Sequence, residues 1–364
     1  MAYLPVDNTN DKQIHDLLRR KEFYSLKADD KYRTDATPQR SRHLKLRSYQ
    51  LFARNYANTD TPYKCLQLSH STGAGKTKAA CAIATEFIDA YKRIYAAAAQ
   101  NKPMRKKQHH YAELAAATPT VFVLGFGGTK AAFVRELMSH PEFGFVSFTE
   151  ISELARRHGV AAAGLADDIK YYTTYYSSLK KRITNKSRGG FYKFYGYDEF
   201  VNRLFYSSTT KLVDIDADHK SRYNAAIRAG IASNDLPSLE DVFNEYLADG
   251  RLQVNESMLA LFENSLLICD EIHNTYNTDA KNNRGIAIQY LRDHVPTLRF
   301  LTLSATLINN SPTEIIETIN YLVPGRITKR EFFADSRTLH PGKLQELGRL
   351  TRGYISFLQD TNIE

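Results

Sequence analysis

Short apolar runs recur along the chain, and stretches with helical spacing separate them. The runs lie at Cys65–Leu68, Thr120–Leu124, Ser265–Cys269 and Arg299–Leu303. Continuous apolar runs of this length are typical of strands that are buried on both faces of a sheet. Helical segments such as Lys78–Tyr91 would then cross between parallel strands. The pattern therefore predicts an α/β fold with a mostly parallel sheet.

The same pattern divides the chain into regions. Residues 1–43 are polar and mixed in charge, which indicates an N-terminal arm. Residues 44–325 hold all the apolar runs and form the expected α/β domain. Within that domain, about 147–262 combines tyrosine- and lysine-rich sequence with helical patterns, and we expect a helical insertion there. Residues 326–364 follow the last run and are interpreted as a linker.

Composition narrows the class of partner and the compartment. The net charge of +9 suits a polyanion, nucleic acid first, although a basic protein without such a partner is an open alternative. The cysteines lie in apolar stretches without a Cys-x-x-Cys pair, which indicates reduced thiols in a reducing compartment and argues against structural zinc. No apolar run could span a bilayer, and Met1–Lys12 lacks a signal-peptide core, so we expect no membrane association.

A glycine-rich loop follows the first apolar run and precedes a helical segment, which is the order that a phosphate site requires. The Lys76 ammonium would reach the β- and γ-phosphates of ATP, and the Thr77 hydroxyl would bind Mg²⁺. His70 stands where the general pattern has glycine, but the segment Gly73–Thr77, which carries the residues that the chemistry needs, is retained. The residues predicted to bind the cofactor here are Ser71, Thr72, Gly73, Ala74, Gly75, Lys76 and Thr77.

An acidic pair, Asp270 and Glu271, directly follows the third run. Acids at the carboxyl end of a parallel strand face the ligand crevice of an open sheet. Asp270 would hold hydrated Mg²⁺, and Glu271 would orient and deprotonate the attacking water. Such a pair is by itself more often a solvated turn or a helix cap. The phosphate loop upstream favours the catalytic interpretation, with Glu271, Lys76 and Asp270 as the catalytic set.

Two smaller motifs complete the predicted site. Ser304 and Thr306 follow the fourth run, and with His273 they would couple the acidic pair to the γ-phosphate. Gln50 lies in the Leu44–Asn58 segment, which has helical spacing. Its carboxamide carries a donor and an acceptor that suit the edge of adenine, and an exposed helical glutamine is the alternative.

Nucleic-acid contacts are predicted after the second run. Gly127, Thr129 and Lys130 would hold the phosphate backbone there, with Arg135 as a further candidate. The tyrosine- and lysine-rich stretch 171–197 would stack exposed bases. Half-buried tyrosines among solubilising lysines are the alternative for that stretch.

Taken together, Arg47–Gln50, Ser71–Thr77, Asp270–His273 and Ser304–Thr306 resemble motifs Q, I, II and III of superfamily 2 helicases. The group that they look most like is the helicase-like ATPases of large nucleocytoplasmic DNA viruses. That group is similar to the poxvirus nucleoside triphosphatase I and to the small subunit of the poxvirus early transcription factor. Leu307 departs from the proline often found there. The resemblance covers about 44–360, also through Phe122–Phe126, Pro141–Phe145, Phe194–Tyr197 and Ile268–Asn274.

The resemblance implies the first RecA-like domain of a DNA-dependent ATPase or helicase with ATP and Mg²⁺ as cofactors. It also implies a role in viral transcription or genome processing. The implied partners are DNA or RNA, a second RecA-like domain or subunit, and a viral RNA polymerase. The implied location is the viral factory in the host cytoplasm, and the virion.

After Thr306 only about sixty residues remain, which is too few for a second RecA-like domain. We therefore expect that 326–364 leads toward a missing domain, and that this chain alone hydrolyses ATP weakly or not at all. Two alternatives stay open, namely a Swi/Snf-type duplex translocase and a non-catalytic scaffold that binds nucleic acid or polymerase. An unrelated phosphate-loop kinase or GTPase would not explain Gln50, His273 and Ser304 together.

Overall fold

The computed structural model covers most of the chain. The residues that it describes are 16–17, 19–24, 26, 44, 46–100, 119–158, 173–185, 190–207, 212–231, 237–277, 280–308, 311–335 and 337–358.

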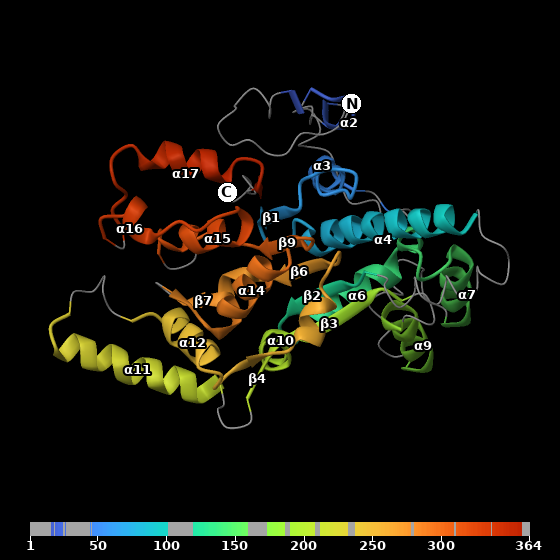
Figure 1. Cartoon of the computed structure of the whole chain (residues 1–364). Helices are drawn as coiled ribbons and strands as arrows, with labels where there is room; N and C mark the ends of the chain where they lie inside the picture. Colours follow the sequence, from blue (N-terminus) through green and yellow to red (C-terminus); the bar gives the residue numbers. More distant parts are fainter. Residues whose placement is uncertain are drawn as a thin grey trace.

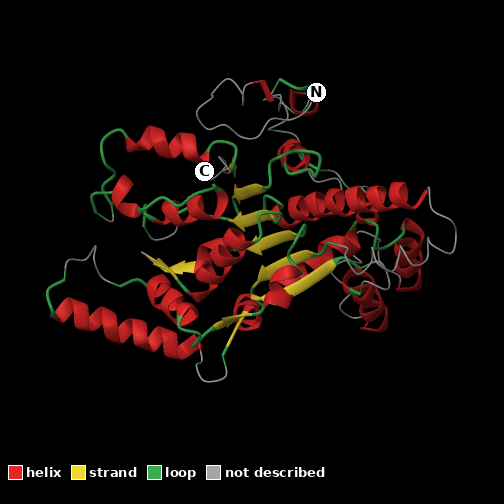
Figure 2. Cartoon of the chain, viewed as in Figure 1, coloured by secondary structure: helices red, strands yellow, loops and turns green. Residues whose placement is uncertain are grey.

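A parallel sheet of six strands forms the centre of the molecule (Figure 2). The strand order is β10-β1-β9-β6-β2-β3, and each neighbouring pair is parallel. The α/β fold with a parallel sheet is therefore confirmed, and its architecture is that of a RecA-like domain. The strands span Cys65–His70 (β1), Val121–Gly125 (β2), Tyr192–Gly196 (β3), Leu266–Asp270 (β6), Arg299–Ser304 (β9) and Ile355–Leu358 (β10).

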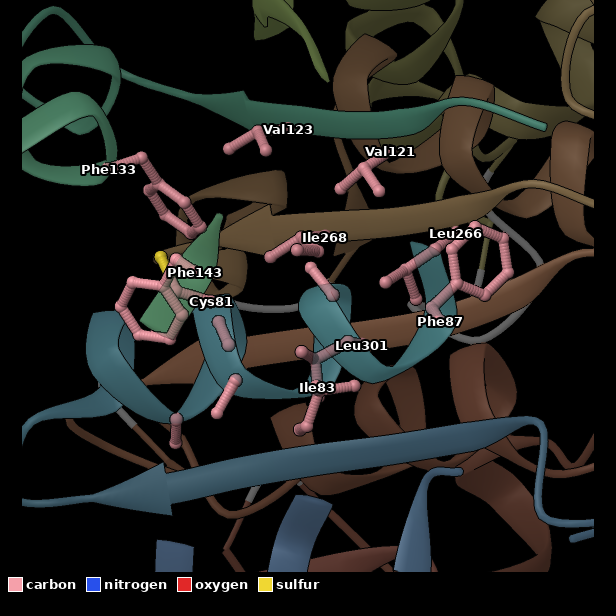
Figure 3. Close-up of a cluster of buried hydrophobic side chains, with 14 of the residues drawn as sticks. Cys81, Ile83, Phe87, Val121, Val123, Phe133, Phe143, Leu266, Ile268 and Leu301 are labelled. Atoms are coloured by element: carbon pink, nitrogen blue, oxygen red, sulfur yellow. The ribbon is translucent and has the colours of Figure 1, made fainter. Parts of the chain in front are cut away.

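One face of the sheet is covered by α3 (Ser48–Tyr56), α4 (Lys76–Gln100), α6 (Thr129–Ser139) and the short 3₁₀ turn η2 (Pro141–Phe143). Alternate side chains of the strands point to this face and pack against α4 and α6. Figure 3 shows the arrangement, with strand residues such as Ile268 beside Cys81 and Phe87 of α4. The 25-residue helix α4 is therefore fixed along its apolar side, which sets the position of its first turn.

The opposite face packs against α10 (Tyr197–Leu204), α12 (Leu239–Ala248), α13 (Glu256–Ala260) and α14 (Asn283–His294). The strand side chains that alternate with the first set, such as Phe122 and Cys269, are buried here. Because both faces are covered, the central strands are mainly apolar, and the buried Thr302 hydroxyl donates to Gln67 Oε1 at 3.0 Å.

The region 147–262 differs from the expected helical insertion in one respect, because it supplies β3 at one edge of the main sheet. Its helices are α7 (Phe148–His158) and α9 (Thr173–Thr184), together with α10 to α13. Figure 1 places α7 and α9 beside the β3 end of the sheet and α11 (Leu212–Arg228) with α12 on the other flank. Two small antiparallel pairs complete this flank, β4 (Phe205–Tyr206) with β5 (Gln253–Val254) and β7 (Tyr276–Asn277) with β8 (Ala280–Lys281).

The C-terminal segment differs from the expected linker. After α15 (Glu314–Leu322) the chain forms α16 (Lys329–Phe332), α17 (Lys343–Thr351) and then β10, which pairs with β1 at the sheet edge. The backbone groups of β10 that face β1 are paired, and the Ile355 side chain packs against the neighbouring buried clusters. The helices α15 to α17 gather on this side (Figure 1).

Part of the N-terminal arm is also packed. Leu17 and Phe23 are buried, and the Phe23 ring lies 5.1 Å from that of Phe52 in α3, with α2 (Lys21–Tyr24) carrying Phe23. Most of the remaining residues of 1–43 lie outside the described ranges. Within those ranges, the helices are too short or too polar to cross a bilayer.

Candidate nucleotide-binding site

The predicted phosphate loop connects the end of β1 to the first turn of α4, which begins at Lys76. Gly73 and Gly75 have φ angles of 83° and 80°, a left-handed conformation that other residues rarely adopt. Their positions let the loop curl over the N-terminus of α4, where backbone N–H groups and the helix dipole favour an anion. The Lys76 ammonium lies inside the curl, 2.8 Å from the carbonyl oxygen of His70.

His70, the residue in place of the usual glycine, points away from the loop. Its side chain is fully buried, and Nε2 lies 2.9 Å from the Ser356 hydroxyl of β10. The Tyr49 ring meets it edge-on with centroids 5.3 Å apart. Burial, and then the neighbouring charge of Lys76, lowers the pKa of His70 to about 4, so the imidazole is neutral at pH 7. The histidine therefore joins the loop to the edge strand and leaves the phosphate side open.

The Gln50 side chain contacts the same loop from α3. Its Oε1 accepts from the Arg47 N–H at 2.9 Å, and its Nε2 donates to the Gly75 carbonyl at 3.0 Å. The neighbouring Tyr49 hydroxyl donates to the Ala74 carbonyl. Gln50 is only 3% exposed, so the alternative of an exposed helical glutamine is wrong. Adenine recognition by Gln50 stays a prediction, because these contacts hold its carboxamide against the loop.

The acidic pair lies at the carboxyl end of β6. The Thr129 hydroxyl, at the start of α6, donates to Asp270 Oδ2 at 2.7 Å, and the Tyr197 hydroxyl donates to the Asp270 carbonyl at 2.7 Å. Burial raises the pKa of the Asp270 carboxyl, and the Thr129 bond opposes that rise. The structure thus places Thr129, predicted as a nucleic-acid contact, on the carboxylate predicted to hold Mg²⁺. Tyr197 belongs to the stretch 171–197 that was predicted to stack exposed bases, but its ring is buried and its hydroxyl contacts the acidic motif.

Glu271 is held in an unusual backbone conformation, with a φ of 53°. Its Oε2 lies 3.3 Å from His273 Nδ1, which is 2.9 Å from the Ser304 hydroxyl. Ser304 Oγ in turn donates to the Thr306 carbonyl at 2.5 Å and accepts from the Thr306 N–H. Asn274 Nδ2 lies 3.1 Å from His273 Nε2. A continuous chain of contacts therefore links the acidic pair to the Ser-Ala-Thr motif.

The order of the strands brings these motifs together at the carboxyl ends of β1, β9 and β6. Strand β9, which ends at Ser304, lies between β1 and β6, with Ser69 opposite Ser304 and Asp270 opposite Leu303. The Thr77 hydroxyl and the Asp270 carboxylate are oxygen donors of the kind Mg²⁺ prefers, and such sites use one or two protein oxygens with phosphate and water. Among the described residues, no cluster of three or more His, Cys, Asp or Glu residues suited to a metal occurs.

The remaining nucleic-acid candidates are exposed at the surface. Gly127, Lys130 and Arg135 all lie on or just before α6, and the Lys130 ammonium is 5.8 Å from the Phe194 ring centroid. Phe126, in the predicted loop after β2, is exposed beside them with the Arg284 guanidinium 5.2 Å from its ring. Ser356 was also missed, because nothing in a sequence pairs residues 286 positions apart.

No family model matches the chain. Two African swine fever virus proteins, from tick isolates of South Africa and Malawi, are each named early transcription factor large subunit homolog. They are 34% identical over 338 and 337 residues, which is 88% of this chain but only 28% and 29% of those proteins. A protein of Acanthamoeba polyphaga mimivirus, named as an inferred ATP-dependent RNA helicase, is 34% identical over 103 residues, 27% of this chain and 9% of that protein. The chain thus spans less than a third of the length of the African swine fever virus proteins that it matches, and its similarities are to viral proteins named for transcription and for helicase activity.

Proposed function

We propose that this chain is the ATP-binding domain of a viral superfamily 2 ATPase that acts on nucleic acid during transcription or genome processing. The arrangement of β1, β9 and β6 carries the proposal, because it sets the phosphate loop, Ser304 and the acidic pair side by side at one sheet edge. The homologies to viral transcription and helicase proteins support the biological setting. The chain spans about 28% of the length of the transcription-factor relatives.

Each residue of the site has a role that its position supports. Lys76 would neutralise phosphate charge at the N-terminus of α4, and the Thr77 and Asp270 oxygens would hold Mg²⁺. Bound Mg·ATP would supply the phosphoryl group that is transferred to water. Glu271 orients and deprotonates that water. His273 touches both Glu271 and Ser304, so it can report the state of the catalytic carboxylate to the strand β9.

Stimulated turnover needs a second RecA-like domain, in the same protein or in another subunit. Such a domain would supply an arginine that stabilises the transferred phosphoryl group, a contribution of ~10³–10⁵ in rate. We therefore propose that this region alone binds nucleotide and hydrolyses it slowly. Nucleic acid, and a viral RNA polymerase, are the partners that the proposal implies.

The test is Glu271→Gln, which keeps the shape of the side chain but removes the base. We expect single-turnover ATP hydrolysis to fall by ~10²–10⁴, while Mg·ATP affinity changes by less than about threefold. Lys76→Ala should instead abolish Mg·ATP binding. Glu263→Gln is the matched control, because Glu263 is exposed and precedes β6, whereas Glu271 follows it. Hydrolysis by Glu271→Gln at the wild-type rate would refute the assigned base.

A nucleotide-binding scaffold is the second candidate. One observation favours it. The relatives that match 88% of this chain are named as early transcription factor large subunit homologs, whereas the helicase relative matches only 27% of it. A scaffold predicts that Mg·ATP binds at Lys76 and persists unhydrolysed when single-stranded DNA and the full-length protein are present. Hydrolysis that depends on Glu271 and is stimulated by DNA would exclude it. Strand displacement by the full-length protein would then separate a helicase from a duplex translocase of the Swi/Snf type.

A further inference from the structure

An open apolar groove of about 600 Å³ lies on the C-terminal side of the molecule, away from the catalytic carboxylates. Its floor is a cluster of buried side chains from α15, α16 and α17, which includes Ile315, Phe333 and Leu347. Its wall includes Ile355 and Phe357 of β10 and the segment Leu307–Ile308. A groove of this size falls within the range of specific ligand and peptide sites.

The groove is lined by large apolar side chains that are exposed to solvent. Leu344 and Phe357 are 73% and 63% exposed, more than any other large apolar side chain in the described part of the chain, and both line it. Ile308, 44% exposed, lies in the same lining. Contiguous apolar surface of this kind marks an interaction site, whereas single exposed apolar residues do not.

One face of α17 is shaped to receive a partner. Leu344, Leu347, Gly348 and Thr351 all line the groove, and their spacing puts them on one side of the helix. A Cβ added to Gly348 would meet nothing within 4 Å, so the middle of this stripe is open to close approach. The stripe therefore suits an elongated segment that lies along the helix.

The charge of the lining selects the partner. Arg337 and Arg352 are the charged residues that line the groove, and the Asp335 carboxylate, which accepts from the Arg337 N–H at 2.7 Å, lies outside the lining. An apolar segment that carries a carboxylate would bury its apolar side chains and meet the Arg337 guanidinium at the same time. A second copy of this chain is a poorer match, because its own groove presents the same positive charge.

The groove also borders the elements that hold the nucleotide site. Leu307–Ile308 directly follows the Ser-Ala-Thr motif, and β10 contributes both Ser356, which contacts His70, and the Leu358 carbonyl, which accepts from the Ser71 N–H at 3.0 Å. An occupant of the groove would therefore contact the same strand and loop that support the phosphate loop.

We propose that this groove is the docking site for an acid-bearing apolar segment of a protein partner. Peptide binding at the groove does not require ATP hydrolysis, so this proposal and the proposed function can fail independently.

The test pans a displayed library of random peptides of about twelve residues against the chain. Enriched peptides should combine at least two of Leu, Ile, Phe and Met with an Asp or Glu. Leu344→Asp should weaken the best peptide at least about tenfold in fluorescence polarisation. Residue 344 is in the first turn of α17, where an acidic side chain favours the helix, so the fold should be kept. Ile231→Asp, at an apolar residue exposed outside the groove, is the matched control and should bind normally.

A charge exchange tests the acidic requirement directly. Arg337→Glu should lose affinity for the acidic peptide and recover it when the peptide acid is replaced by lysine. Three results would overturn the proposal: enriched peptides without acids, equal binding to Leu344→Asp, or no groove-dependent binder at all, which would favour a folded partner. Concentration-dependent dimerisation of the chain that Leu344→Asp abolishes would assign the groove to self-association instead.

Discussion

At the residue scale, His70 combines a structural contact with an unusual ionisation. It is buried beside Lys76 and bonded to Ser356, and its pKa is lowered to about 4 by burial first and by Lys76 second. The unfolded chain has an ordinary histidine with a pKa near 6.5. Between these values the unfolded state binds a proton that the folded state rejects. The stabilising contribution of the neutral ring is therefore complete above about pH 6.5 and is lost as the pH falls toward 4.

Replacing His70 with glutamine should remove this dependence. Chemical denaturation at a series of pH values should show the wild-type free energy of unfolding falling, relative to His70→Gln, by up to about 3 kcal/mol between pH 6.5 and 4. Asp270, whose pKa is raised by burial, titrates in the opposite sense, but it is present in both proteins and cancels in the difference. Parallel curves for the two proteins would show that His70 ionises normally in the fold.

Thr129 is the residue for which the sequence and the structure point to different ligands. Its hydroxyl is bonded to Asp270, so Thr129→Val should weaken Mg·ADP binding by about tenfold and leave single-stranded DNA affinity unchanged. Lys130→Ala should do the reverse, because its exposed ammonium has no contact with the acidic pair. Isothermal titration of both ligands separates the two outcomes, and Thr129→Ser, which keeps the hydroxyl, should bind like the wild type. Loss of DNA affinity in Thr129→Val would restore the original assignment.

At the element scale, the turn between β2 and α6 depends on a close approach. A Cβ on Gly125 would lie 2.3 Å from Thr129 Oγ1 and 2.6 Å from Thr129 Cβ, so the first turn of α6 would have to move. Gly125→Ala should therefore lower the free energy of unfolding by about 1–3 kcal/mol and weaken Mg·ADP binding, since Thr129 would lose Asp270. Gly128→Ala is the matched control, because a Cβ there meets nothing within 4 Å and its φ is −82°. Equal stabilities in denaturant titrations would contradict the tight packing of this turn.

The strands also show what a sequence can and cannot reveal about elements. The four central strands were predictable because burial on both faces gives each of them a run of mainly apolar residues. Edge strands escape this rule. Residues Tyr192–Gly196 form β3 but contain a lysine and half-exposed rings, so they looked like part of a basic insertion. Residues Ile355–Leu358 form β10 after a stretch that was interpreted as a linker.

At the scale of the whole molecule, motif residues were predictable because their chemistry is local, whereas their partners were not. The loop Ser71–Thr77 and the pair Asp270–Glu271 can be read from a few adjacent letters. The contacts of Asp270 with Thr129 and of His70 with Ser356 join residues 141 and 286 positions apart, and only the sheet order brings them together. The groove beside α17 is likewise a product of packing, since its lining is drawn from separate segments between Leu307 and Phe357.

The net charge of +9 suits nucleic acid, and the basic residues of α9 are candidates for the contact with phosphates. In α9, Arg182 is already paired with Glu150 at 2.8 Å, so it holds α9 against α7 and is a poor candidate for phosphate contact. Lys180 and Lys181 remain as the candidates of that helix. Replacing both with glutamate lowers the net charge to +5, and should flatten the salt dependence of single-stranded DNA binding by about 1.4 in log–log slope if both contact phosphates.

The matched control makes the same change of net charge elsewhere. Lys220→Glu with Arg228→Glu also gives +5, but on exposed positions of α11, on the opposite flank from α9. If only the overall field of the protein attracted DNA, both pairs of substitutions would weaken binding alike. A change of slope confined to the α9 pair would instead place bound DNA along α9. An unchanged slope in both would remove these helices from the nucleic-acid surface and leave Gly127, Lys130 and Arg135, after β2 and on α6, as the remaining predicted contacts.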